Sequence, residues 1–398
     1  MPYYIGDVIK DYNKLVIRTP EAFGKTGIKV LTKTRVEEID AARGEVRLAD
    51  GSRLPYDSLT IATGARATRL DIPGVDLDGV FVLRDLSDAL RIKDYLNGRA
   101  CRRAVIVGGG FIAMEMSEAL RNLGIETTVI VRRHRPVPRW DEEFCAPILE
   151  ELEKNGVLFQ GGTTPLSIER NGEGLVVKTN SGDLGADLVL MAVGVRSNTE
   201  LAAAAGVEMG ESGAIKVDFR QQTSVPGIYA VGDCCEVFHK VARRWVYIPL
   251  GDIANKQGRV AGQNIGGRPA EFPGVVGAQS FKVFGLEVAA AGLNENEAVK
   301  YGFAPASAFI QGLPVGRPMA RGERLLVKLT ADKTTGRLIG AQCLGAKGAV
   351  QRIFALSAAL WNGMTVDEVG YLDLPYAPPF GGAWDAIHVA AQELARSL

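Results

Sequence analysis

The residues with the clearest chemical meaning form a glycine-rich turn. It fits the pattern G-x-G-x-x-G/A over Gly108-Gly109-Gly110-Phe111-Ile112-Ala113. A predicted strand at 104–107 precedes the turn, and a predicted helix and a second strand at 126–131 follow it; this context predicts a dinucleotide-binding unit. Gly108 would permit the tight turn, Gly110 would let the backbone approach a pyrophosphate, and Ala113 would let the helix pack closely on the strand. The alternative is a glycine-rich turn that binds nothing.

The residues after the second strand bear on the choice of nucleotide. An acidic side chain there would accept a hydrogen bond from the 2′-hydroxyl of NAD. This chain has Val131-Arg132-Arg133-His134-Arg135 instead, so no carboxylate is available and guanidinium groups could hold a 2′-phosphate. We therefore expect Arg132 and Arg133 to favour NADPH, or both nucleotides to be used. The alternative is a solvated basic turn.

Two shorter motifs end apolar strands. The first is Ala62-Thr63-Gly64, and the second is Gly232-Asp233. An Asp just past such a strand can accept from a ribitol or ribose hydroxyl, and the Gly lets a ligand lie against the backbone. Taken singly, each motif is more often an ordinary turn than a binding site.

The five cysteines do not form a disulfide framework or a zinc site. No C-x-x-C is present, and the three histidines are scattered. We expect Cys234-Cys235 in a packing role, because adjacent cysteines form only a strained ring. Free thiols indicate a reducing cytoplasm. The other three read as buried thiols: Cys101, Cys145 and Cys343.

Composition excludes several classes of protein. The 398 residues carry 46 basic and 46 acidic side chains, and this balance argues against nucleic acid or an anionic membrane as the main partner. No apolar stretch is long enough for a membrane span, and the N-terminus lacks the plan of a signal peptide. A protein of this length suggests two to three domains.

The patterns along the chain predict elements that would position these residues. From about 276 the segments become strand-rich, so an α+β module is expected after α/β modules. Thr365 and Glu368 form a capping box that would open a short helix. Strands are expected at 28–34, 45–49, 58–62, 187–193, 280–285, 325–329 and 337–345, and helices at 87–97, 114–124, 141–155 and 347–361. Asp141 is expected to be the N-cap of the helix at 141–155.

Together and in this order, the motifs resemble the pyridine nucleotide–disulfide oxidoreductases. The resemblance covers the whole chain. Within that family, the sequence is similar above all to the branch that contains coenzyme A-disulfide reductase, NADH oxidase and persulfide or sulfur reductases. Further matches are Pro2-Tyr3-Tyr4-Ile5-Gly6, the segments 18–23, 194–199 and 254–259, and Tyr376-Ala377-Pro378-Pro379-Phe380 followed by Trp384-Asp385.

The resemblance implies an α/β fold with two Rossmann-like domains and a C-terminal α+β dimerisation domain. The FAD domain would be split into 1–82 and 217–275 and incomplete at its N-terminus, with the NAD(P) domain at 83–216 inserted and the dimerisation domain at 276–398. The cofactors would be FAD and NADPH or NADH. The partners would be a small-molecule sulfur acceptor and a second copy of the chain, with neither nucleic acid nor membrane involved.

The resemblance also implies roles for single residues. Tyr376, offered by the partner subunit, would be an acid–base or hydrogen-bonding group beside the redox cysteine, or else a structural Tyr in a Pro-rich turn. Glu115 would face the nicotinamide, or else be a solvated helix residue. The fold implied by the resemblance would place Cys234-Cys235 at the start of a helix, where the thiol pKa is lowered. The remaining cofactor-binding positions are Val36, Ala62, Thr63, Gly64, Gly194, Gly232, Asp233 and Ala254.

The family pattern begins before this chain does. A first strand–GxGxxG–helix unit for FAD and a redox cysteine, in the context Cys-Gly-x-Pro-Tyr-Tyr, would precede Pro2. We expect the true start to lie upstream; the alternative is a short product that binds nucleotide and dimerises without catalysis. Phe111, the segment 315–321 and Trp384 depart from the branch pattern and argue against coenzyme A disulfide itself. The terminal acceptor, a disulfide, a persulfide or oxygen, therefore stays open.

Overall fold

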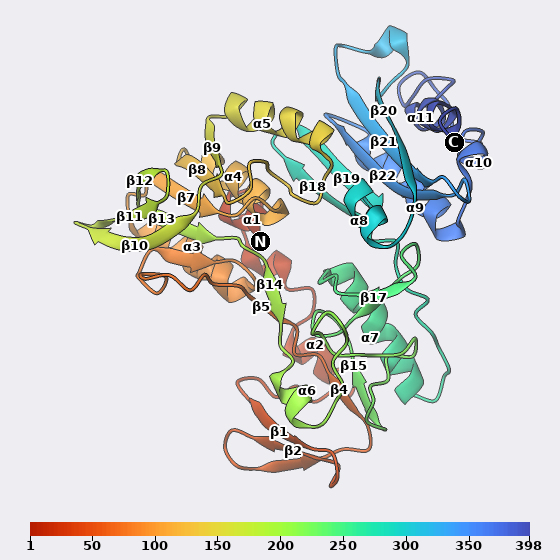
Figure 1. Ribbon diagram of the computed structural model, residues 1–398. Helices are drawn as coiled ribbons and strands as arrows, with labels where there is room; N and C mark the ends of the chain where they lie inside the picture. Colours follow the sequence, from red (N-terminus) through yellow and green to blue (C-terminus); the bar gives the residue numbers. More distant parts are fainter. The chain divides into compact units, whose positions relative to one another are not determined.

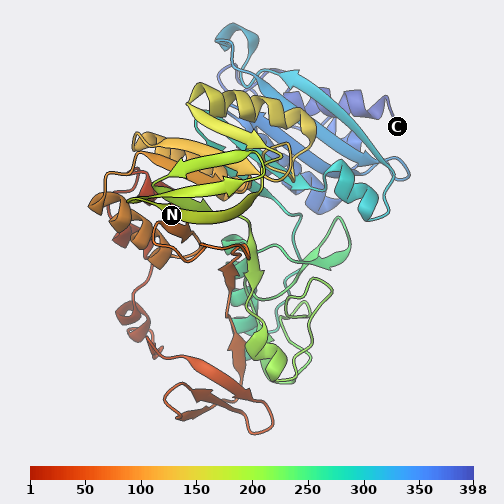
Figure 2. The same ribbon diagram turned by 60° about the vertical axis from the view of Figure 1, so that its left-hand side comes forward.

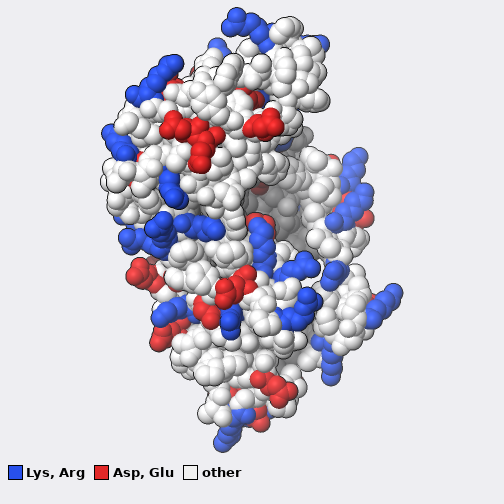
Figure 3. Space-filling view, turned by 90° about the vertical axis from the view of Figure 1, so that its right-hand side faces the viewer, with Lys and Arg blue, Asp and Glu red and all other residues white.

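The computed structural model describes residues 1–398, which divide into two compact units. The first contains Met1–Lys10, Ala67–Gly194 and Val276–Leu398, and the second contains Asp11–Arg66 and Val195–Val275. None of the helices has the length and apolar character that crossing a membrane requires. On the face shown in Figure 3, basic and acidic side chains are interspersed and neither sign dominates.

The first unit contains a five-stranded parallel sheet (Figure 1). From the middle strand, the chain adds two strands on one side of the sheet and then returns to add a strand on the other side. The order in which strands are added therefore reverses beside the middle strand. In open α/β sheets, ligands bind at this reversal, outside the carboxyl ends of the strands. In spatial order the strands are β6 (Val80–Val82), β13 (Leu188–Met191), β7 (Arg103–Val107), β8 (Glu126–Val131) and β9 (Val157–Gly161).

Three helices and a small antiparallel sheet accompany the parallel sheet. The predicted strand–helix–strand unit at 104–131 is confirmed as β7, α4 and β8, and the predicted helix at 87–97 is confirmed as α3. The helices are α3 (Leu86–Gly98), α4 (Phe111–Asn122) and α5 (Cys145–Lys154), preceded by α1 (Pro2–Ile5) and the 3-10 turn η2 (Glu142–Phe144); the small sheet is β10 (Pro165–Asn171), β11 (Gly174–Thr179) and β12 (Gly182–Ala186).

The C-terminal part of the first unit is an antiparallel sheet with helices packed against it (Figure 2). Every residue of its two adjacent inner strands, β21 and β22, is buried. The predicted strands at 280–285, 325–329 and 337–345, the helix at 347–361 and the Thr365–Glu368 capping box are confirmed. The order is β18 (Gln279–Val283), β19 (Leu286–Gly292), β22 (Leu338–Gly345), β21 (Leu325–Asp332) and β20 (Pro305–Gly312), with α8 (Glu295–Lys300), η3 (Arg317–Met319), α9 (Ala349–Asn362), α10 (Val366–Val369) and α11 (Ala386–Ala395).

Carboxylates on the parallel-sheet side bind the antiparallel sheet. Glu118 of α4 pairs with Lys282 at 2.5 Å and accepts from the backbone N–H of Phe284 at 2.8 Å. Glu151 of α5 accepts from the N–H of Gly285 at 2.9 Å. These helix side chains therefore hold the turn between β18 and β19.

A second anchor surrounds Lys328, whose side chain is only 3% exposed. Its ammonium lies 2.7 Å from Glu143, 3.2 Å from Asp141 and 3.2 Å from Glu295. Burial alone would lower the pKa of Lys328, but the three carboxylates outweigh it and raise that pKa. Asp141 also binds Gln342 through its backbone N–H and its side chain. Asp141 was expected to cap a helix, but its carboxylate is used for this anchor and makes no capping hydrogen bond.

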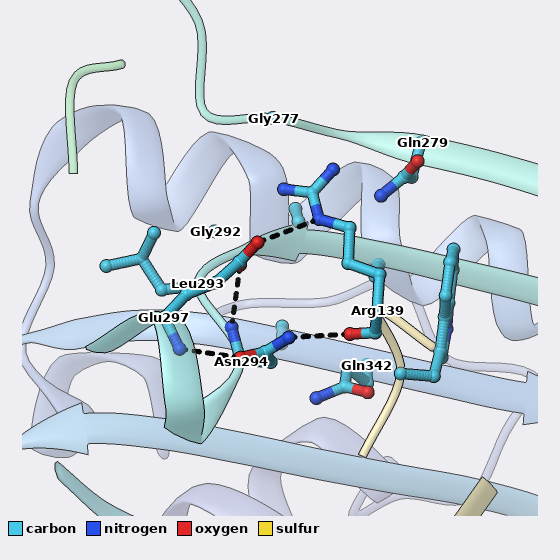
Figure 4. A pocket seen from close by; sticks show the side chains of 12 residues that line it. Arg139, Gly277, Gln279, Gly292, Leu293, Asn294, Glu297 and Gln342 are labelled. Carbon is cyan, nitrogen blue, oxygen red and sulfur yellow. Dashed lines mark hydrogen bonds and ion pairs between the residues drawn. The ribbon is translucent and has the colours of Figure 1, made fainter. Parts of the chain in front are cut away.

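Arg139 adds a third contact beside this anchor. Its guanidinium pairs with Glu297 at 3.2 Å, and its carbonyl accepts from the side chain of Asn294 at 2.7 Å (Figure 4). Arg139 and Asn294 both line a small pocket between the chain segment before α5 and the start of α8. The segment 139–141 is thus fixed to the antiparallel sheet by side chains from three of its elements.

The second unit is built around a pair of parallel strands. Its core includes Ile39, Ile61, Ile215, Ile228 and Cys234. The elements are the antiparallel β1 (Val36–Asp40), β2 (Glu45–Leu48) and β3 (Arg53–Pro55), the parallel pair β4 (Leu59–Ile61) and β15 (Ile228–Ala230), the pairs β5 (Ala65–Ala67) with β14 (Val195–Ser197) and β16 (Val237–His239) with β17 (Arg244–Val246), and η1 (Tyr12–Leu15), α2 (Pro20–Gly24), α6 (Glu200–Ala204) and α7 (Gly251–Ile265).

One expected strand is wrong. Residues 28–34 form no strand, and β1 begins only at Val36. Ile28 and Val30 are exposed, and Lys33 adopts a positive φ of 54°, which interrupts an extended run. The three-domain division stays a prediction; in the structure residues 195–216 belong to the second unit, where Ala202, Val207 and Ile215 join the core.

The Lys328 anchor leads to a stability prediction. Lys328→Met should lower the free energy of unfolding by about 3–5 kcal/mol, because it leaves the buried carboxylate of Asp141 without its counter-charge. Lys282→Met is the matched control; its half-exposed ion pair with Glu118 should be worth at most about 1 kcal/mol. Denaturant unfolding of both variants measures the difference, and equal losses would contradict the role of Lys328 as the main anchor.

Candidate functional site

Gly108 lies at the carboxyl end of β7, where the order of strands reverses. Its φ is +121°, a conformation that side-chain-bearing residues rarely adopt. A Cβ atom there would overlap the backbone carbonyl of Ala192, which follows β13. The backbones that follow β7 and β13 therefore approach each other closely, and glycine is required at 108 by both conformation and space.

Gly110 is required by neither. It is the N-cap of α4 with an ordinary φ of −80°, and nothing lies within 4 Å of a Cβ built on it. No side chain caps the helix there, so its first N–H groups and the positive end of its dipole face open space. An uncapped helix N-terminus with free space beside it is the arrangement that can receive a phosphate group.

The other residues of the turn divide by burial. Ala113 lies on the buried face of α4, where a larger side chain would separate the helix from the sheet, whereas Phe111 is exposed and Ile112 is half-buried. Gly194 follows β13 with a φ of +108°, and its carbonyl accepts from the N–H of Thr68. The structure brings Gly194 and the glycine turn to the same edge of the sheet, because β7 and β13 are parallel neighbours.

Arg132 and Arg133 follow β8 directly. Both side chains are exposed, and no carboxylate forms an ion pair with either guanidinium, so both are available to an anionic ligand. The chain then returns to the glycine turn, where the N–H of Val137 donates to the carbonyl of Gly109 at 2.7 Å. The basic turn and the glycine turn are thus held at one edge of the sheet.

Glu115 lies one turn into α4 and is half-buried. Burial raises the pKa of its carboxyl, although a hydrogen bond from the hydroxyl of Tyr3 at 3.5 Å opposes this. The segment that carries Tyr3 packs tightly on α4, since a Cβ on Gly6 would lie 2.8 Å from the Cα of Ala119. Glu115 is therefore neither a freely solvated helix residue nor part of an ion pair with a basic side chain.

In the second unit, the two strand-end motifs come together. The N–H of Val231 donates to the carbonyl of Ile61 at 3.0 Å, so the turn at 62–64 and the turn at 232–233 both follow the carboxyl ends of adjacent parallel strands. Gly64 and Gly232 have positive φ values of 65° and 78°, as turns that approach a ligand require. Nothing lies within 4 Å of a Cβ built on Gly64.

Polar side chains fix both turns. Thr63 donates its hydroxyl to the carbonyl of Asn198 at 2.6 Å, and the Asn198 amide returns a bond to the carbonyl of Thr63. Gln257 of α7 accepts from the N–H of Gly232 at 2.8 Å. A Cβ atom on Gly232 would lie 3.4 Å from Ala254, which is also in α7. Val36, another expected cofactor-binding residue, begins β1 and packs against the core of the second unit.

Asn198 and Gln257 were not identified as site residues from the sequence. Both lie inside segments that match the family, 194–199 and 254–259, so the signal was present but gave no geometry. Their side chains act on turns that are distant in the chain, and no local pattern reveals that.

Cys234 and Cys235 are buried as expected, but they lie in a turn and not at the start of a helix. The N–H of Cys235 closes this turn onto the carbonyl of Gly232, and Cys235 then pairs with Ile215 in a β-bridge, which leads the chain into β16. A hydrogen bond between the two thiols lowers the pKa of Cys234 to about 7 and raises that of Cys235. With no exposed surface, Cys234 has no route to a substrate.

Tyr376 lies in the loop between α10 and α11. Its side chain is 58% exposed and makes no hydrogen bond within the chain. The loop itself is held, because the N–H of Gly316 donates to the carbonyl of Pro378 at 2.7 Å. Tyr376 is thus presented outward on a supported loop and is not used in packing.

Comparison with known proteins agrees with this geometry. Residues 4–258 match the family described as pyridine nucleotide-disulphide oxidoreductase, and residues 278–387 match its dimerisation domain. The chain belongs to this family. Its members are flavin-dependent enzymes that use a pyridine nucleotide, and the α/β architecture with a C-terminal dimerisation domain is that of the family.

Three relatives illustrate the similarity. The chain is 38% identical to an NAD(P)H sulfur oxidoreductase (CoA-dependent) from Pyrococcus abyssi, over 98% of this chain and 88% of that protein. It is 36% identical to an NAD-dependent persulfide reductase from A. fulgidus, with a TM-score of 0.96 over 100% of this chain and 75% of the other. It is 26% identical to an engineered NADPH oxidase, with a TM-score of 0.94 over 100% of this chain and 90% of the other; the parent of that oxidase is the water-forming NADH oxidase of Lactobacillus brevis.

The burial of the cysteines leads to a labelling prediction. Cys101 is the only cysteine that is not buried, so an alkylating reagent should label it first and label Cys234 only on unfolding. Burial raises the pKa of Cys101 to about 11. Because the thiolate is the nucleophile, its labelling rate should rise about tenfold per pH unit between about pH 7 and 10. Peptide mass mapping checks the order, and early labelling of Cys234 would show that it is reachable after all.

Proposed function

We propose that the protein is an FAD-dependent oxidoreductase that uses NADPH to reduce a disulfide, a persulfide or a related sulfur acceptor. The observation that carries the proposal is the glycine turn at the strand reversal, with open space at Gly110, in a chain 38% identical to a sulfur oxidoreductase. The overall reaction would be NADPH + H⁺ + RSSR → NADP⁺ + 2 RSH. With a persulfide, RSSH, the products would be RSH and H₂S.

The basic turn supports NADPH over NADH. Arg132 and Arg133 are exposed and unpaired, and an arginine fork matches a phosphate group in two hydrogen bonds. The engineered NADPH oxidase supports the same chemistry, because its described substitutions replace one Asp and introduce two Arg. This chain has no acidic residue between Val131 and Arg139, so a 2′-phosphate would meet only positive charge there.

FAD is proposed for the second unit. When bound, the flavin would take a hydride from the nicotinamide and pass two electrons to sulfur. The turn at Thr63-Gly64 and the carboxylate of Asp233 would hold its ribitol, and the positive φ angles of Gly64 and Gly232 keep side chains out of that space. Asn198 and Gln257 would keep the two turns in place.

We further propose a cytoplasmic homodimer in which Tyr376 serves the partner subunit. The five free cysteines support a reducing compartment. The exposed side chains of Phe354, Phe380 and Trp384 support a second copy as the partner, as does the match to the dimerisation domain. Tyr376 would donate to or accept from the reacting sulfur, and Glu115, with its raised pKa, would face the nicotinamide.

An NAD(P)H oxidase is the second candidate, and the similarity to the NADH oxidase from Lactobacillus brevis favours it. The two functions share every residue of the nucleotide site and differ only in the acceptor. A nucleotide-binding dimer without flavin chemistry is the third outcome that the experiment must separate.

The test is anaerobic reduction of the purified protein followed by addition of acceptors. NADPH should bleach the flavin absorbance, and a low-molecular-weight disulfide or persulfide should restore it faster than oxygen does. Restoration by oxygen alone would favour the oxidase, and absence of flavin would leave the nucleotide-binding dimer. Gly110→Ala is the control, because its backbone and surroundings accept a methyl group while the pyrophosphate does not, so it should fold normally and stay unbleached.

The choice of nucleotide has its own prediction. Removing both guanidiniums in Arg132→Ala/Arg133→Ala should weaken NADPH binding about 10- to 100-fold, since charge-assisted hydrogen bonds contribute about 1.5–3 kcal/mol each. NADH binding should change less than about threefold, because NADH lacks the phosphate. Calorimetric titration of each nucleotide gives both constants. Arg102→Ala, before β7 and also exposed, is the matched control, and an equal effect there would point to general electrostatics.

A further inference from the structure

The basic turn at 132–135 needs a support of its own, because none of its arginines is held by an ion pair with a carboxylate. Its backbone rests on the end of β9, where Gly161 and Gly162 are adjacent. The N–H of Gly162 donates to the carbonyl of Arg133 at 3.1 Å. Because β8 and β9 are parallel neighbours, the end of β9 lies beside this turn.

The approach at Gly161 leaves no space for a side chain. A Cβ atom on Gly161 would lie 2.8 Å from the carbonyl oxygen of His134 and 2.9 Å from its Cα, below the 3.0 Å that real Cβ contacts respect. The φ of Gly161 is not positive, so its conformation alone would accept any residue. Close contact with the basic turn is therefore the reason that glycine is needed there.

Gly162 continues the same support under the imidazole. A Cβ there would lie 2.6 Å from Cε1 of His134, and the residue also has a positive φ of 74°. Two successive glycines thus form a flat seat, Gly161-Gly162, on which the backbone and the ring of His134 both rest.

The far side of the turn cannot yield. Val137 is buried, adopts a positive φ of 42° that is strained for a β-branched residue, and binds the carbonyl of Gly109. Beyond it, Glu297 fixes Arg139 (Figure 4), and Gln342 and Lys328 fix Asp141. A displacement at the seat must therefore be absorbed by residues 132–135, of which Arg132, Arg133 and His134 have exposed side chains.

From this geometry we infer that Gly161 is a positioning residue for nucleotide choice: by seating the basic turn, it sets where Arg132 and Arg133 meet the 2′-phosphate. The inference rests on the proposed preference for NADPH. A methyl group at 161 pushes the backbone of His134 and moves the two guanidiniums, while the glycine turn that binds the pyrophosphate lies on β7 and keeps its place.

The experiment compares Gly161→Ala with Gly98→Ala by calorimetric titration of NADPH and NADH. Gly98 ends α3, has nothing within 4 Å of its Cβ position and has no positive φ, so it receives the same chemical change without a contact. Gly161→Ala should weaken NADPH about tenfold, the loss of one charge-assisted contact, and leave NADH within about twofold. Gly98→Ala should leave both nucleotides unchanged.

A double-mutant cycle separates positioning from general damage. In the Arg132→Ala/Arg133→Ala background, Gly161→Ala should have no further effect on NADPH. A parallel loss of NADPH and NADH affinity, or the same loss without the arginines, overturns the inference, and a thermal unfolding scan identifies a variant that is simply unfolded. If the unmodified protein binds both nucleotides equally, the proposed preference fails and the inference falls with it. If the preference holds but Gly161→Ala preserves it, the inference alone is overturned.

Discussion

The close approach of two backbones at the carboxyl ends of β7 and β13 is the constraint on which the proposed nucleotide site depends. Gly108 can turn there only because it has no Cβ, and the carbonyl of Ala192 occupies the space that a side chain would need. This turn directs α4 so that its uncapped N-terminus opens at the edge of the sheet. In the proposed nucleotide site, recognition then depends on which groups are held next to that helix end.

The surrounding structure holds those groups through a succession of backbone contacts. The basic turn lies on Gly161-Gly162, the segment after it returns to Gly109, and its end is tied by Asp141 to Lys328. Desolvation makes a buried ion pair an uncertain source of stability, yet removing one partner is costly, so such a cluster fixes one arrangement against others. This explains why the parallel sheet and the antiparallel sheet fall into one compact unit.

The sequence predicted best where the signal is local. The strand–glycine turn–helix unit and the Thr365 capping box depend on neighbouring residues, and both are confirmed. The errors arise where partners that are distant in the chain determine the structure. Asp141 is a residue type that often caps helices, but its carboxylate pairs with Lys328, and Cys235 forms a β-bridge with Ile215. The apolar run at 28–34 alternates like a strand, but no neighbouring strand pairs with it. The seat at Gly161 could not be predicted, because glycine is common and its contact with His134 is long-range.

The cysteines fit a protein that handles reactive sulfur. Thiol–disulfide exchange requires a thiolate that a second sulfur can reach, so a reductase of disulfides or persulfides must keep its structural thiols out of the reaction. Burial achieves this at Cys145 and Cys343, where it also raises the pKa of the thiol. At Cys101 the raised pKa compensates for partial exposure. At Cys234 the opposite balance holds, because a lowered pKa is tolerated only where the sulfur has no exposed surface. At each of these positions the thiol is thus either inaccessible or weakly acidic. This is the condition for electrons to leave by a single route.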